Sequence, residues 1–331
     1  MKKRAAVVFS LSPQLGEGWE LQKALAFSKA FLALLVFFLL GCRSAAPPKP
    51  PPVAVNMAER AEEQAVKLSS QQQNWPAAAR AWQLAADRFS LLNDVAGEAV
   101  ALHNLSQAER ALGQQEQARK HLEQAAGLNQ ETKRTNEWWR NQIALLQLEA
   151  DSRDTNALKT RFEELLPLAG LLRDRFIQGL FQNELGLWEM IQGEFAKAEG
   201  SFAEAEQNLR SVNDSAALVA IDANRAELYE SEKKFPAALA AWKAALVKFE
   251  ALADPPGIAR ALAGQGRTLL AAGENLATAE KLLRRAAHNY QILHEAEPAR
   301  FTLELLARCL TAEGKSKEAE SVRQELQRGQ N

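Results

Sequence analysis

Side chains able to support catalysis or metal binding are few in this chain of 331 residues. The four histidines show no HExxH or similar spacing, so we expect ordinary surface or half-buried positions for them. They are His103, His121, His288 and His294. Two cysteines are too few for a disulfide framework, and Cys309, within a helical run, is expected to be a small buried hydrophobe. The sequence therefore predicts no metal site.

Other patterns that could indicate an enzyme are explained by packing or by solvation. Acidic pairs such as Glu163-Glu164 are expected on a helix surface, and an array of helices offers no cleft that would perturb a carboxylate. Gly264-Gln265-Gly266 is a weak phosphate-loop signal, which we interpret as two small packing positions within a helix. We therefore expect no catalytic residue and no cofactor, and an enzyme is the least favoured class.

The N-terminal segment is typical of a targeting signal. Lys23 and Lys29 precede the apolar run 30–40, which has the length of a signal-peptide core and is short for a membrane-spanning helix. Leu39-Leu40-Gly41-Cys42 resembles the lipobox of bacterial lipoproteins. The resemblance implies cleavage between Gly41 and Cys42 and attachment of acyl chains such as palmitate to Cys42. The alternative is an ordinary anchor helix with an incidental cysteine.

The residues after Cys42 favour the lipoprotein interpretation. Five prolines within 47–52 form a semi-extended tether, suited to holding a domain away from a membrane. In the lipoprotein family an Asp after the lipidated cysteine tends to retain proteins at the inner membrane, and Arg43 departs from that pattern. We expect an envelope protein anchored by lipid, at the outer membrane facing the periplasm where two membranes exist. The segment before Lys23 is long for a signal peptide, so we expect translation to start nearer Leu21.

The organisation that follows is a signal peptide at 1–41, a lipidated cysteine and proline-rich tether at 42–56, and a helical repeat domain at 57–331. Ala, Leu, Glu, Gln, Lys and Arg dominate the composition, and aromatic residues make up only 7%, which favours helices over sheets. The formal net charge is −1, and no block of like charge occurs. A nucleic-acid partner is therefore not expected.

The repeat domain has a period of 40 residues, with one spacing of 41. Each anchor is small or apolar, and the first six are followed, four residues later, by a large apolar residue on the same helix face. The anchors are Ala78, Ala118, Leu158, Ala198, Ala238, Ala279 and Ala319. Glycines five or six residues before an anchor are expected to end a helix with a left-handed cap. They are Gly113, Gly193, Gly273 and Gly314, so each unit is predicted as helix A, turn, helix B.

The fourth unit carries the motif Leu185-Gly186, then Gly193, Ala198, Phe202 and Ala205. It resembles the tetratricopeptide repeat, here with a period of 40 instead of 34. The resemblance covers about seven units and implies an all-α fold, a right-handed α-α superhelical solenoid whose A helices line a concave groove. Gly186 would let its A helix pack closely against neighbouring repeats.

The third unit departs from the pattern, because it has no glycine before its anchor and opens with Trp138-Trp139. We expect local distortion or a shifted boundary there. Adjacent tryptophans usually divide, with one in the core and one half covered, and we expect the same of this pair.

The resemblance also implies which positions face the groove. They flank the small signature residue of each A helix, and are His103, Gln107, Arg110, Asn183, Leu187, Met190, Glu227, Glu230, Arg267 and Arg308. Any one of them could instead be a solvated surface residue. The Lys/Asn set of the carboxylate-clamp members is incomplete here. The leading hypothesis is a lipid-anchored scaffold that binds a protein or peptide partner, in assembly of an envelope complex. The alternative is an envelope receptor for a small ligand or glycan, which would need a closed, aromatic-lined pocket.

Overall fold

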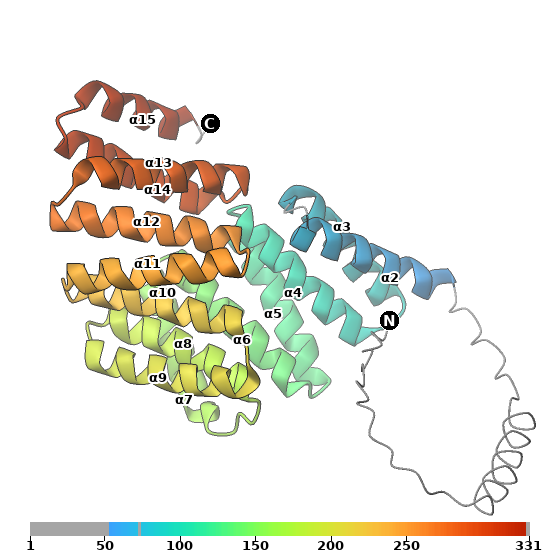
Figure 1. Ribbon diagram of the computed structural model, residues 1–331. Helices are drawn as coiled ribbons and strands as arrows, with labels where there is room; N and C mark the ends of the chain where they lie inside the picture. Colours follow the sequence, from blue (N-terminus) through green and yellow to red (C-terminus); the bar gives the residue numbers. More distant parts are fainter. Residues whose placement is uncertain (1–52, 72–73, 329–331) are drawn as a thin grey trace, which may run out of the picture. The chain divides into compact units, whose positions relative to one another are not determined.

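The computed structural model describes residues 53–71 and 74–328, and this part of the chain is helical, with no strand (Figure 1). The predicted signal peptide, Cys42 and most of the predicted tether lie outside the described residues. The first helix begins at Val53, inside the segment predicted as the tether. Among the described helices, none combines the length and the apolar character needed to cross a membrane.

The described helices pair into seven consecutive hairpins, each with a helix A and a helix B. In the first hairpin, α2 (Val53–Val66) leads through a π-helical segment, η1 (Lys67–Gln71), into α3 (Trp75–Leu91). The others are α4 (Val95–Ala111) with α5 (Gln115–Glu131), α6 (Thr135–Asp151) with α7 (Thr155–Ala169), α8 (Arg175–Ile191) with α9 (Phe195–Val212), α10 (Ser215–Ser231) with α11 (Phe235–Ala251), α12 (Pro255–Ala272) with α13 (Leu276–Ile292), and α14 (Ala296–Ala312) with α15 (Ser316–Arg328). The predicted all-α, tetratricopeptide-like solenoid is confirmed.

The turn between helix A and helix B has the same backbone conformation with or without glycine. Gly113, Gly193, Gly273 and Gly314 all have positive φ, as predicted for a left-handed cap. The third hairpin reaches that conformation with Arg153, at φ 55°. Its distortion lies elsewhere: α7 is short, contains Pro167 near its end, and is followed by an irregular link to α8.

The core is built from the repeat anchors and the large residues that follow them. Ala198, Ala238 and Trp242 are fully buried, and the anchors of the other hairpins are buried as well. Trp139 is buried while Trp138 is half-buried, and Cys309 is buried, as predicted. These contacts explain why a single hairpin could not be stable alone, since each buries its apolar face against its neighbours.

Two glycines show how closely the helices approach. A Cβ added to Gly186 would lie 2.6 Å from Cε1 of Phe202, which belongs to helix B of the same hairpin. The prediction that Gly186 faces a neighbouring repeat is therefore wrong, because Gly186 allows α8 to pack closely against α9 within one hairpin. Gly264 does face a neighbouring repeat, since its Cβ would lie 2.3 Å from Cε2 of Trp242. Its interpretation as a packing position is confirmed.

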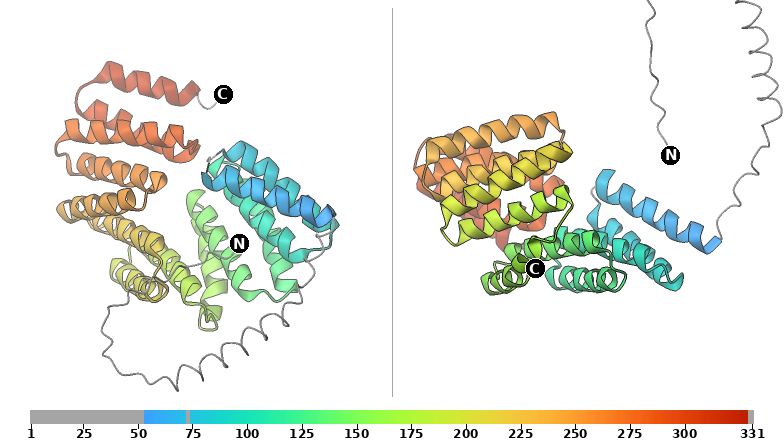
Figure 2. Two further views of the ribbon diagram at one scale, coloured as in Figure 1. Left: turned by 45° about the vertical axis from the view of Figure 1, so that its right-hand side comes forward. Right: turned by 90° about the horizontal axis from the view of Figure 1, so that it is seen from below.

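The array curves with its A helices on the inner side. Successive A helices contact one another directly, as α8 does α10 and α10 does α12, whereas each B helix before α15 packs between A helices of two hairpins. The curvature carries the seventh hairpin back toward the first, as the left view of Figure 2 shows. There the indole Nε1 of Trp75 donates to the carbonyl oxygen of Leu293, at 3.2 Å.

Candidate functional site

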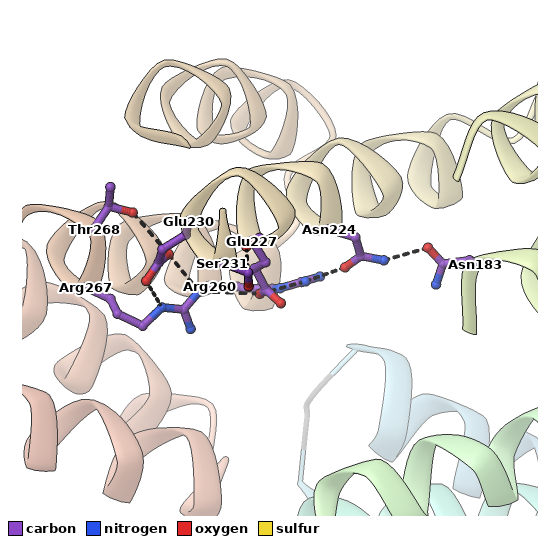
Figure 3. A network of polar contacts seen from close by, with 8 residues as sticks. All are labelled: Asn183, Asn224, Glu227, Glu230, Ser231, Arg260, Arg267 and Thr268. Carbon is purple, nitrogen blue, oxygen red and sulfur yellow. Dashed lines mark hydrogen bonds and ion pairs between the residues drawn. The ribbon is translucent and has the colours of Figure 1, made fainter. Parts of the chain in front are cut away.

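A row of polar side chains crosses the inner face from one A helix to the next (Figure 3). Asn224 of α10 donates through Nδ2 to Oδ1 of Asn183 of α8, at 2.5 Å. The guanidinium of Arg260, on α12, donates to Oδ1 of Asn224 at 2.5 Å and to Oε1 of Glu227 at 3.0 Å. Each of these contacts joins residues 33 to 41 positions apart, which is about one repeat.

The row ends on α12 in a two-pronged ion pair. Arg267 donates to both carboxylate oxygens of Glu230, at 2.8 and 3.1 Å, and lies 3.8 Å from Glu227. Thr268 adds a hydroxyl donor to Glu230 at 3.2 Å. Such bidentate Arg–carboxylate pairs fix geometry as well as charge.

The same row extends in the other direction to α4. Arg110 is paired with Asp151 at 2.5 Å and donates to Gln147 at 3.1 Å, both on α6. Gln147 in turn donates to Glu184 of α8 at 2.9 Å. We call the whole row the inner polar ladder: Arg110, Gln147, Asp151, Asn183, Glu184, Asn224, Glu227, Glu230, Arg260, Arg267 and Thr268. It connects five successive A helices, from α4 to α12.

The charges of the ladder largely satisfy one another. Burial would raise the pKa of Glu227, but Arg260 and Arg267 outweigh it and lower that pKa. Burial likewise opposes the charge of Arg267, yet Glu227 and Glu230 raise the pKa of its guanidinium. The ladder therefore fixes the spacing of the A helices and leaves little net charge on the inner face for a partner.

Glu184 is the exception within the ladder. It is buried, and burial raises its pKa, against the opposing hydrogen bond from Gln147 and the charge of Arg110. The expectation that this array offers no environment able to perturb a carboxylate is wrong at this position, because the A helices pack closely enough to exclude water.

The raised pKa of Glu184 predicts a pH dependence of stability. Because the folded state holds the proton more tightly than the unfolded chain, the free energy of unfolding should fall as pH rises from near 4.5 through the folded pKa, and then level off. Glu184→Gln should remove that fall and stabilise the protein at neutral pH. Urea unfolding at pH 5 and pH 8 measures both, with exposed Glu164→Gln as the control. Equal pH slopes for wild type and Glu184→Gln would contradict it.

The structure brings together half of the residues predicted for the groove. Arg110, Asn183, Glu227, Glu230 and Arg267 all belong to the ladder. They are engaged with neighbouring A helices, so their side chains are already bonded within the protein.

The other five predicted residues lie outside the ladder. His103 accepts from Asn141 Nδ2 at 3.0 Å, and burial together with Arg140 lowers its pKa to about 4, so it is neutral. Leu187 and Met190 pack against the core of the fourth and fifth hairpins. Gln107 lines a cavity described below. Arg308 is exposed, and within the described chain no hydrogen bond or ion pair engages its side chain.

Sequence reasoning missed six members of the ladder, which are Gln147, Asp151, Glu184, Asn224, Arg260 and Thr268. The period of 40 could have found Gln147, which is one period after the predicted Gln107, whereas Asn224 is one period after Glu184, which was itself missed. Gln147 was missed because the third unit was set aside as irregular. The pairing itself has no sequence signal, since it depends on how far each A helix is displaced from the next.

A cavity of about 470 Å³ lies where the curvature brings the two ends of the array together. Its lining comes from α3, α4, the start of α5, the end of α6 with the turn that follows it, and the start of α14. It includes Trp75, Gln107, Arg110, Arg153, Glu295 and Phe301. The guanidinium of Arg153 stacks over the ring of Phe301, 5.9 Å from its centre. This volume is in the range of ligand pockets. Among the described residues, no group of three or more His, Cys, Asp or Glu is placed to hold a metal ion.

No protein-family model matches the chain, and no curated protein does. Among solved structures it resembles a Rap protein complexed with Competence and Sporulation Factor, with 16% identity, a TM-score of 0.57, and coverage of 80% of this chain and 76% of that one. It also resembles the apo form of RapI, with 13% identity, a TM-score of 0.53, and coverage of 81% of this chain and 100% of that one. The similarity shows a shared fold. At such identities it carries no residue from those proteins to this one.

Proposed function

We propose that this protein is a cell-envelope scaffold that binds a protein or peptide partner on its inner face, without catalysis. The observation that carries the proposal is the cavity of about 470 Å³ on that face, which combines unpaired polar groups with aromatic walls. The solved Rap protein that shares this fold was obtained in complex with Competence and Sporulation Factor, which supports a binding role for such an array.

The alternative of a glycan receptor is less well supported. Trp82, Trp139 and Trp242 are buried among the helices and cannot offer a flat ring to a sugar. Of the aromatic residues at the cavity, Trp75 is held by Leu293 and Phe301 is covered by Arg153. A stacking platform would require these rings to be free.

Photo-crosslinking tests partner binding directly. A benzophenone amino acid at Gln107, at the cavity, should capture a partner in native envelopes. The same probe at Val247, which is 65% exposed on helix B of the fifth hairpin, should not, because that helix lies on the outer side. Equal capture from both positions, or from neither, would refute binding on the inner face.

Anchoring by lipid is the second part of the proposal, and rests on the basic-then-apolar segment that ends at Cys42. Cys42→Ala should abolish incorporation of labelled palmitate and release or mislocalise the domain, since no other acyl acceptor is expected. Cys309→Ala is the matched control, because that thiol is buried and should leave labelling unchanged. Continued labelling of Cys42→Ala would exclude the lipoprotein assignment.

A further inference from the structure

The cavity of about 470 Å³ is a composite of the two ends of the array. The first three hairpins supply one wall, and the start of α14 in the seventh supplies the other. Two contacts join the walls: Trp75 with the carbonyl of Leu293, and Arg153 with the ring of Phe301. The site is therefore complete only when the ends meet.

Most charges at the cavity are neutralised within the protein. Arg110 is paired with Asp151 at 2.5 Å. On the opposite wall, Arg300 is paired with Glu297 at 2.7 Å and with Glu304 at 2.6 Å. The lining as a whole holds three arginines and three carboxylates, so it carries no net charge that would select a strongly anionic or cationic ligand.

Two opposite charges at the cavity remain unsatisfied in the described chain. Arg153 stacks on Phe301 but forms no ion pair, and the half-buried carboxylate of Glu295 has no hydrogen-bond or ion-pair partner. Burial raises the pKa of Glu295, and the charge of Arg110, which is itself paired with Asp151, offsets that effect only in part. The side-chain amide of Gln107 is also without a hydrogen bond there. One free cation, one free anion and one free amide complement a peptide with charged ends.

We infer that the cavity binds a short peptide by both of its free termini, with the ammonium group at Glu295, the carboxylate at Arg153 and a backbone amide at Gln107. The inference rests on the proposed function and specifies the partner's chemistry. Ala111 and Pro298 are apolar parts of the lining that the two contacts between the walls leave uncovered, and side chains of the peptide can pack against them. Because the peptide contacts both walls, it stabilises the closed arrangement of the array.

Tripeptide libraries test this inference on the full chain. A library with free termini should raise the midpoint of thermal unfolding, and native mass spectrometry should show bound peptides. An N-acetylated library and a C-amidated library should each bind at least about tenfold more weakly, because each lacks one charged contact. Loss of binding in both blocked libraries indicates a short peptide held at both ends. One end of a longer protein would supply only one terminal charge, so only one of the two blocked libraries would then bind more weakly.

Two variants assign each terminus to its residue. Arg153→Ala should make free and amidated peptides bind alike, and Glu295→Gln should make free and acetylated peptides bind alike. Arg285→Ala, at an exposed position on α13 with no ion pair in the described chain, should preserve the preference for free termini. Equal binding of blocked and free libraries, or no binding by either, would overturn the inference. If crosslinking from Gln107 still captures a partner in that case, the proposed function stands and only the peptide assignment fails.

Discussion

Gly264→Ala should lower the free energy of unfolding by about 1–3 kcal/mol, although alanine ordinarily stabilises a helix relative to glycine by about 0.5–1 kcal/mol. The new Cβ would lie 2.3 Å from Cε2 and 2.6 Å from Cδ2 of Trp242. That indole is fully buried between hairpins, so neither it nor the backbone of α12 can move without opening the interface. The midpoint of thermal unfolding, followed by circular dichroism, measures the loss.

Gly200 provides the matched control for Gly264. It also lies within a helix, α9, but a Cβ there would meet no atom within 4 Å. Gly200→Ala should therefore stabilise the protein, so the two substitutions are expected to have opposite signs. Adding Trp242→Phe to Gly264→Ala should recover part of the loss, because the smaller ring makes room. Stabilisation by Gly264→Ala would contradict the packing argument.

The repeat geometry could be predicted from the sequence because it depends on local signals. Anchors such as Ala198 and large residues such as Phe202 recur with the period, and each is buried as that pattern requires. Glycine before an anchor marks the left-handed turn in four hairpins, but the turn does not require it. Arg153 and Lys233 adopt positive φ in hairpins that lack the glycine, because the packing of the two flanking helices over-determines the turn.

The inner polar ladder and the cavity could not be predicted in the same way. Gln147 meets Glu184, and Asn224 meets Asn183. These pairings depend on small displacements of each A helix relative to the preceding one. The contact of Trp75 with Leu293 joins residues 218 positions apart. It arises because small rotations per repeat accumulate along the array, and no short sequence pattern encodes that sum. The residues of the candidate site were thus partly predictable, but their pairing was not.

Arg161→Met should lower the free energy of unfolding by about 3–5 kcal/mol, because it removes the main partner of a buried carboxylate. Glu149 is 1% exposed, and its Oε1 accepts from Arg161 at 2.8 and 2.7 Å and from Arg119 at 3.1 Å. Without Arg161, only one cation would remain for a charge that water cannot reach. Urea unfolding of the variant measures the loss.

A second substitution distinguishes the net contribution of the Arg161–Glu149 ion pair to stability from the cost of leaving Glu149 without Arg161. Glu149→Met in the Arg161→Met background should restore much of the lost stability, because it removes the buried carboxylate, while Arg119, whose side chain is 24% exposed, can be solvated once its partner is gone. The Oε2 atom of Glu149 is buried without a hydrogen-bond partner in the described chain. Removing the carboxylate therefore also removes the free-energy cost of burying that oxygen unpaired. Lys159→Met is the control: two residues away on α7, its exposed pair with Glu163 spans 3.8 Å and should contribute little. If Arg161→Met were as mild as Lys159→Met, Glu149 would have to be solvated, and the packing of α6 against α7 described above would be wrong.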